Sequence, residues 1–133
     1  MPFVNVKLIK NQVSPEKKKE LIEGLTDLIV NIMGRERKFT VITVDELNED
    51  QWAIGGSTLD QPQEEINVVT FVNIKVSNGT TNPEEMANMI KAIKELMVGI
   101  FGNYNEANYV IIDELNPAAW GFDGMSMSQR RML

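Results

Sequence analysis

The first third of the chain shows the apolar patterns of a strand followed by a helix. Phe3 to Ile9 alternates with β-branched residues, which is typical of a strand. Ser14, Pro15 and Glu16 then supply an N-cap hydroxyl, a proline for the first helical position and a first-turn acid. Gly34 is placed to end the predicted helix. The apolar face of this predicted helix consists of Leu21, Leu25, Leu28, Ile29 and Ile32.

The same order of elements recurs in the second half. A second strand is expected from Phe39 to Val44, and Trp52-Ala53-Ile54-Gly55-Gly56 is typical of a short turn or hairpin. Further on, the pattern predicts strands at 68–76 and 109–112, a helix starting at Asn82-Pro83-Glu84 and closed by Gly102, and a turn at Trp120-Gly121-Phe122. The apolar stripe of this helix, whose methionines we interpret as core residues, is Met86, Met89, Ile90, Ile93, Leu96, Met97 and Ile100.

A shift of 68 residues aligns the two halves without a gap. Phe3-Val4-Asn5-Val6-Lys7 then matches Phe71-Val72-Asn73-Ile74-Lys75. Between residues 3–58 and 71–126, 17 of 56 pairs are identical, where ordinary composition gives about three or four. The chain is therefore a duplicated unit.

We expect a single domain over residues 1–133, built from two repeats. The first β-α-β unit is 1–58, a polar linker is 57–67, the second unit is 68–126 and a tail is 127–133. Helices of about 20 residues between paired strands imply parallel pairing by right-handed crossovers. The predicted fold is α+β, with β-α-β-β-α-β order and a four-stranded sheet carrying two helices on one face. The other face then needs a cover, and oligomerisation would supply it.

Composition excludes several classes of function. The net charge is −6 without a basic tract, which argues against nucleic-acid binding. No apolar run reaches the roughly 20 residues of a membrane span, and no signal-peptide pattern precedes the fold, so we expect a cytoplasmic protein. The chain has no cysteine and no histidine, which removes the usual metal ligands and the usual general base, and we expect no metal or cofactor. Acid–base catalysis would have to use carboxylates, lysine, tyrosine or the N-terminal amine.

Pro2 is a candidate for that amine. If Met1 is removed, Pro2 carries a free secondary amine at the start of a strand, where proline is tolerated. A free α-amino group has a pKa of about 8, and desolvation or a nearby cation lowers it towards neutral pH. A Met-Pro start is also common for unrelated reasons. If Met1 stays attached, the nitrogen of Pro2 is an amide and cannot act as a base.

Together, Pro2, the β-α-β unit that it begins and the Trp52-Ala53-Ile54-Gly55-Gly56 turn resemble the tautomerase superfamily, whose type member is 4-oxalocrotonate tautomerase. The resemblance covers nearly the whole chain, once per copy, as in fused double-length members. It implies a tautomerase/MIF-like fold, a homotrimer and a small-molecule substrate. It also implies that the Pro2 amine moves a proton between the enol and keto forms, or the unconjugated and conjugated forms, of a small 2-keto or 2-hydroxy acid. Thr70 aligns with Pro2 and is internal, so each chain has at most one such amine.

The family's arginines are missing from this chain. The arginine after the first strand is replaced by Gln12, with Thr80 in the second copy, and that of the second strand by Val41, with Tyr109 opposite. Guanidinium groups bind dicarboxylates by paired hydrogen bonds, so 4-oxalocrotonate itself is not the expected substrate. The superfamily's decarboxylases and dehalogenases also have arginines just after the third strand. This chain has Ser77-Asn78-Gly79-Thr80 there, which does not favour those activities.

Three cations remain as candidates for binding a substrate anion. Lys10, just after the first strand, is the first choice, although a solvated surface lysine is the alternative. Arg35 and Arg37 are further candidates, and both lie in a charged segment, Arg35-Glu36-Arg37-Lys38, that is also typical of a solvated turn.

Three aromatic residues complete the candidate site. Trp52 and Trp120 fall where the resemblance implies an apolar wall, and packing at a subunit contact is the alternative for both. Tyr109 could donate a hydrogen bond to an oxyanion, or it could lie at an interface between subunits.

Two other functional classes stay open at this stage. The missing arginines favour a tautomerase-fold protein that binds a small molecule or only assembles, without turnover. An unrelated ferredoxin-like binding domain would share the β-α-β-β-α-β order, but it does not explain the duplicated tryptophan turn.

Overall fold

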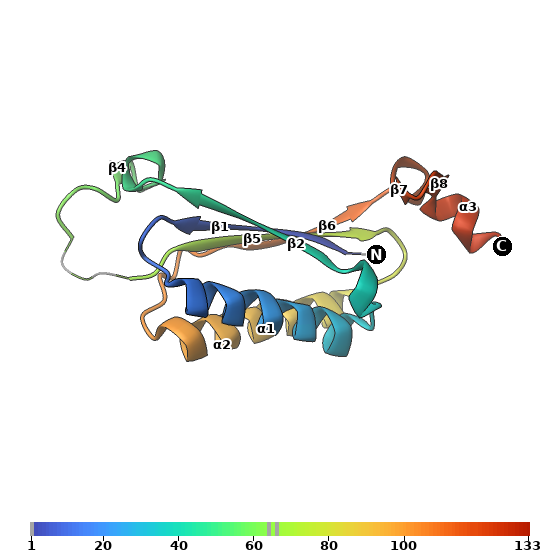
Figure 1. Cartoon of the computed structure of the whole chain (residues 1–133), viewed down its shortest axis with the longest axis horizontal. Coiled ribbons are helices and arrows are strands. Elements are labelled where there is room, and N and C mark those ends of the chain that lie inside the picture. The colour runs from blue at the N-terminus through green and yellow to red at the C-terminus, as the bar shows by residue number, and fades with distance from the viewer. Residues whose placement is uncertain (1, 64, 66) are drawn as a thin grey trace.

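The fold is a four-stranded sheet with two long helices on one face, as the sequence predicts (Figure 1). The computed structural model describes residues 2–63, 65 and 67–133. The strand order is β2-β1-β5-β6, with parallel pairs at each edge and an antiparallel β1–β5 pair in the middle. The bounds are β1 (Phe3–Ile9), α1 (Pro15–Met33), β2 (Val41–Leu47), β5 (Thr70–Ser77), α2 (Pro83–Phe101) and β6 (Val110–Leu115).

The structure repeats with the period found in the sequence. The two long helices begin and end at positions 68 residues apart, and each copy closes with a short hairpin. These hairpins, β3–β4 (Ala53–Ile54 and Ser57–Thr58) and β7–β8 (Gly121–Phe122 and Met125–Ser126), extend from opposite ends of the sheet (Figure 1). The duplication is thus visible in three dimensions.

Local capping explains why the helices start where they do. The side chain of Ser14 accepts a hydrogen bond from the Lys17 N–H at 3.2 Å, and Asn82 accepts one from the Glu85 N–H at 2.8 Å. Gly34 ends α1 in the left-handed conformation, with φ of 65°. The segment expected to be a tail also folds in part, because Ser126 caps a third helix, α3 (Met127–Arg131).

The core lies between the sheet and the two helices. Leu21, Leu25 and Ile29 on α1, and Met89, Ile93 and Met97 on α2, are fully buried or nearly so. They face the strand residues Val4, Val6, Leu8, Val72, Ile74 and Val76. The interpretation of the α2 methionines as core residues is confirmed for Met89 and Met97. Ile90, which belongs to the predicted apolar stripe, is 43% exposed and lines a cavity between α2 and β6 together with Val110.

Two strands end later than expected. β2 starts at Val41 because Arg37–Phe39 forms a 3-10 turn, and it runs on to Leu47 because the whole of β1 pairs with it. In the same way β6 continues to Leu115, which pairs with Ser77. The segment expected to be a linker, 57–67, is described except for residues 64 and 66, and its first two residues form β4.

The second face of the sheet is not covered within one chain. Two ion pairs cross it, Lys7–Asp45 at 3.0 Å and Lys75–Asp113 at 3.1 Å. Hydrogen bonds from these lysines and from neighbouring asparagines lower the pKa of both carboxyl groups. Large apolar side chains are exposed beside them, namely Phe3, Val41 and Ile111. No described helix is long and apolar enough to cross a membrane.

Candidate functional site

Pro2 is buried at the start of β1, between the beginning of β2 and the end of β5. Its carbonyl oxygen accepts a hydrogen bond from the Val41 N–H at 3.5 Å. The register pairs the next residue, Phe3, with Lys75, so Pro2 lies beside the last residues of β5. The first strand residue needs no ladder donor, which is why proline fits here. Met1 lies outside the described residues, and its retention or removal stays a prediction.

A cavity of about 360 Å³ opens at this end of the sheet. Its walls come from the segment after α1, the segment after β5, the β7–β8 hairpin and α3, which lie together at the end of the molecule where the chain begins (Figure 1). Pro2 itself does not line this cavity. Two residues on neighbouring segments do: Phe39, in the 3-10 turn before β2, and Ser77, the last residue of β5. The remaining lining residues are Gly34, Arg35, Glu36, Thr80, Phe122, Met127, Arg130 and Arg131.

Arg35 is a partly buried cation of this cavity. Its Nη2 donates to the carbonyl oxygen of Thr80 at 2.7 Å and to the Oγ1 of Thr80 at 2.8 Å. Its Nε is buried and has no hydrogen-bond partner. Burial lowers the pKa of Arg35, Glu85 opposes that shift, and Arg131 adds to it. An arginine remains charged at such a site, so Arg35 presents a partly desolvated positive charge. It is not a solvated turn residue.

Two more arginines reach the cavity from α3. The guanidinium of Arg130 lies 3.7 Å from the ring centroid of Phe122 and donates to the carbonyl oxygen of Phe122 at 2.9 Å. The Nε of Arg130 is also buried without a partner. Arg131 is exposed and donates to the carbonyl oxygen of Asn78 at 3.2 Å. Phe122 in turn packs against Phe39, with ring centroids 4.9 Å apart.

These α3 arginines were not among the predicted site residues, because the segment 127–133 was expected to be a tail. The signal that could have found them is an adjacent pair of arginines in an acidic chain, immediately after a segment that begins with a serine N-cap. Phe39 was counted as a strand residue, and Phe122 as part of a turn, without a role in the site.

The opposite end of the sheet holds Thr70, the second copy's counterpart of Pro2, whose backbone nitrogen is an amide already engaged in a hydrogen bond. Thr70 is 1% exposed, and its N–H donates to the Oδ1 of Asn108 at 3.1 Å. Gln12, which stands where the family has an arginine, donates to the carbonyl oxygen of Asn67 at 2.9 Å and accepts from the Val69 N–H at 3.2 Å. These contacts hold the incoming chain in place, and the Thr70 nitrogen has no free lone pair.

Three of the predicted substrate-binding residues lie at this opposite end. Trp52 and Tyr109 line a cavity of about 490 Å³ together with Thr70. Lys10 is exposed just beyond β1, with its N–H bonded to the carbonyl oxygen of Leu47 at 2.8 Å. Within one chain, therefore, none of them is brought together with Pro2.

The other two predicted residues lie at the Pro2 end, outside the arginine cavity. Trp120 follows the 3-10 turn after β6 and lines a shallow depression over the β7–β8 hairpin. Arg37 is exposed and forms an ion pair with Asp27. Arg35 and Arg37, which the sequence treats as one charged segment, thus point to different surroundings.

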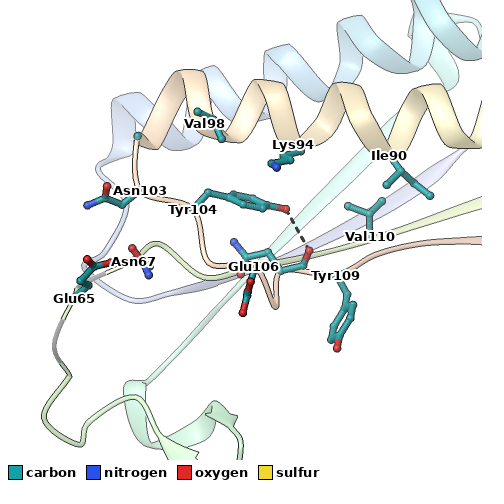
Figure 2. A pocket seen from close by; sticks show the side chains of 12 residues that line it. Glu65, Asn67, Ile90, Lys94, Val98, Asn103, Tyr104, Glu106, Tyr109 and Val110 are labelled. Atoms are coloured by element: carbon teal, nitrogen blue, oxygen red, sulfur yellow. Dashed lines mark hydrogen bonds between the residues drawn. The ribbon is translucent and has the colours of Figure 1, made fainter.

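Figure 2 shows another cavity, of about 630 Å³, between the end of α2 and the start of β6. It is lined by Gly102, Asn103 and Tyr104, which align with Gly34, Arg35 and Glu36 in the repeat. The Tyr104 hydroxyl donates to the carbonyl oxygen of Asn108 at 3.2 Å, and burial raises its pKa. The second copy therefore has asparagine where the first has the enclosed arginine.

Comparison with known proteins gives consistent matches for each half of the chain. A family model described as tautomerase enzyme matches residues 2–61 and again residues 71–130. Probable tautomerase K2 of Dickeya dadantii (strain 3937) is 40% identical over 65 residues, which are 49% of this chain and 97% of that protein. A probable tautomerase of Helicobacter pylori (strain J99) is 34% identical over 61 residues, 44% of this chain and 90% of that protein.

Solved structures match over nearly the whole chain. The structure of a native fused 4-OT has a TM-score of 0.83 at 19% identity, covering 96% of this chain and 97% of that one. A fused 4-OT symmetric trimer has a TM-score of 0.81 at 18% identity, covering 95% and 96%. At this level of identity the likeness establishes the fold.

Proposed function

Because this chain belongs to the tautomerase family as a member of double length, we propose that it is an isomerase that uses the amine of Pro2 as its general base. The substrate is a small 2-keto or 2-hydroxy acid, interconverted between its enol and keto forms or between unconjugated and conjugated isomers. No cofactor takes part. The observation that carries the proposal is the position of Pro2, buried at the strand start beside a cavity that contains arginines.

The environment of Pro2 suits a base that works near neutral pH. A free α-amino group has a pKa of about 8 in water. Burial disfavours the charged ammonium form, and so does a nearby cation such as Arg35, and both effects lower the amine's pKa. The neutral amine then accepts a proton at physiological pH without help from a histidine, which the chain lacks.

The proton transfer needs no other reactant. The amine nitrogen takes the proton from the enol hydroxyl, and the O–H electron pair becomes the second bond of the keto group. The electron pair of the C=C bond then takes a proton from the prolinium nitrogen, which restores the amine. An arginine next to the substrate stabilises the negative charge that develops on oxygen during the transfer.

The test combines intact mass with a pH profile. We expect the mature protein to lack the mass of one methionine residue and to ketonise phenylenolpyruvate faster than buffer alone. The kcat/KM should rise with pH as the amine loses its proton, through an apparent pKa below the reference value of about 8. Retention of Met1 in the native protein, or ketonisation at the buffer rate, would leave only a protein that binds or assembles without turnover.

We also propose that three chains assemble through the uncovered face of the sheet. The exposed apolar residues there, including Val41 and Ile111, would be buried by such an assembly. The fused 4-OT structures described as trimers share this fold, which supports the same arrangement. The interface would also place residues of a neighbouring chain near each Pro2.

Light scattering after size-exclusion chromatography tests the assembly. We expect about 45 kDa, three times the 15.0 kDa of one chain. Ile111→Asp, on the sheet face, should lower this mass because a charge in an apolar interface is costly to bury. Ile90→Asp is the matched control, since Ile90 is 43% exposed and Ile111 44%, but Ile90 lines the cavity between α2 and β6 and does not lie on the uncovered sheet face. A parent protein of 15 kDa at assay concentration contradicts the trimer.

A further inference from the structure

The cavity beside Pro2 is lined by more positively charged than negatively charged side chains. Three arginines line it, Arg35, Arg130 and Arg131, against one lining carboxylate, Glu36. A second carboxylate, Glu85, acts on Arg35 from the start of α2, and its Oε1 accepts a hydrogen bond from the Thr81 hydroxyl. In a chain of net charge −6, such a local excess of positive charge calls for an explanation.

The arginines are also incompletely paired. The Nε atoms of Arg35 and Arg130 are buried, and neither has a hydrogen-bond partner among the described residues. A buried donor without a partner costs roughly 1–3 kcal/mol, and such groups in folded proteins commonly meet a water, an ion or a ligand. None of the three guanidinium groups forms an ion pair within 4.0 Å among the described residues.

Their neighbours hold them in place. Arg35 is fixed by two hydrogen bonds to Thr80, and Arg130 lies over the Phe122 ring with one hydrogen bond to its carbonyl oxygen. Because the guanidinium groups are already oriented, little side-chain entropy is lost when they bind an anion. A planar guanidinium matches a carboxylate better than an ammonium group does.

From these observations we propose that Arg35 and Arg130 form the carboxylate-binding site for the substrate, with Arg131 adding to the local positive potential. The site takes a small monocarboxylate whose apolar part lies against the Phe39–Phe122 pair. These arginines come from the segment after α1 and from α3, positions different from those of the missing family arginines. The inference rests on the proposed function, since the bound carboxylate is taken to belong to the molecule whose proton Pro2 moves.

The comparison between the two ends of the chain supports this assignment. The counterpart of Arg35 is Asn103, and by the same shift of 68 residues the counterparts of Arg130 and Arg131 are Pro62 and Gln63. Among the described residues, the three arginines therefore lie together at the Pro2 end of the sheet and are not repeated at the Thr70 end, although the two copies share their main strands, long helices and hairpins.

Calorimetric titration with phenylpyruvate tests the site, and phenylacetone is the uncharged probe of similar shape. We expect Arg35→Gln and Arg130→Gln each to weaken phenylpyruvate binding at least about tenfold, the effect of losing one charge-assisted hydrogen-bonded contact. Lys91→Gln is the matched control, because it removes one positive charge from an exposed position on α2. Phenylacetone should bind weakly and equally to all four proteins.

Thermal unfolding of each variant shows whether a loss of affinity reflects a loss of folding. Arg35→Lys gives a second measure, since it keeps the charge but not the paired donors, and should fall between parent and Arg35→Gln. Equal phenylpyruvate affinity in the parent and both glutamine variants overturns the site. Arginine-dependent binding in a protein that does not ketonise enols supports the site while contradicting the role of Pro2.

Discussion

Replacement of Pro2 by alanine is expected to lower kcat/KM for phenylenolpyruvate ketonisation by about 100-fold or more, within the range that a positioned general base contributes. Proline's ring fixes its backbone rotation, so its nitrogen lone pair keeps one direction relative to the strand. Alanine retains an amine, but that amine rotates and its lone pair is no longer aimed. A residue added before Pro2 by an uncleaved extension should abolish the activity, because the nitrogen becomes an amide.

Thr70→Val is the control for this experiment. Thr70 aligns with Pro2, but its nitrogen is a buried amide bonded to Asn108. Valine has nearly the same shape and keeps that hydrogen bond, so its kcat/KM should equal that of the parent. Equal rates for the parent, the alanine variant and the extended protein would contradict catalysis by Pro2. Circular dichroism should confirm that all four proteins are folded.

The helices were the most predictable part of the fold because their ends depend on neighbouring residues. Ser14 and Asn82 cap their own helices within three residues, and Gly34 supplies the left-handed turn at the end of α1. Strand ends depend instead on partners far along the chain. The extension of β2 to Leu47 follows from its pairing with Ile9, a contact that no local pattern contains.

The candidate site was less predictable for the same reason. The sequence places Arg35 and Arg37 in one charged segment, but Arg35 reaches Thr80, 45 positions away, while Arg37 pairs with Asp27 on the surface. Lys10, just after β1, was the first choice for binding the anion of the substrate on which Pro2 acts. Lys10 and Pro2 lie instead at opposite ends of that strand, and only the pairing of β1 with β5 shows what surrounds each end.

Thr70 correctly indicated that the second copy has no free amine, but the sequence did not show which group bonds to the Thr70 nitrogen. In the structure this group is the side chain of Asn108. Its Oδ1 accepts the Thr70 N–H at 3.1 Å and its Nδ2 donates to the carbonyl oxygen of Val68 at 2.9 Å. Asn108 is 8% exposed. One side chain therefore satisfies two backbone groups where the linker enters the second copy.

Asn108→Ala should lower the free energy of unfolding by about 1–3 kcal/mol, because it leaves the buried N–H of Thr70 without a partner. The Val68 carbonyl oxygen still accepts a hydrogen bond from the Asn105 N–H at 3.3 Å. Thr40→Ala is the matched control, since Thr40 aligns with Asn108 in the first copy. The Thr40 hydroxyl makes only an exposed bond to the Glu36 carbonyl oxygen at 2.9 Å, and its loss should cost about 1 kcal/mol or less.

Urea unfolding at one fixed protein concentration measures both variants, because the midpoint of an assembled protein depends on that concentration. Enol ketonisation by Asn108→Ala, measured where the variant is still folded, should match the parent, because the change lies at the end of the sheet away from Pro2. If the two alanine variants lose the same stability, Asn108 is not what holds the linker in place. The position of the linker beside Thr70 would then depend on Gln12 and the surrounding packing.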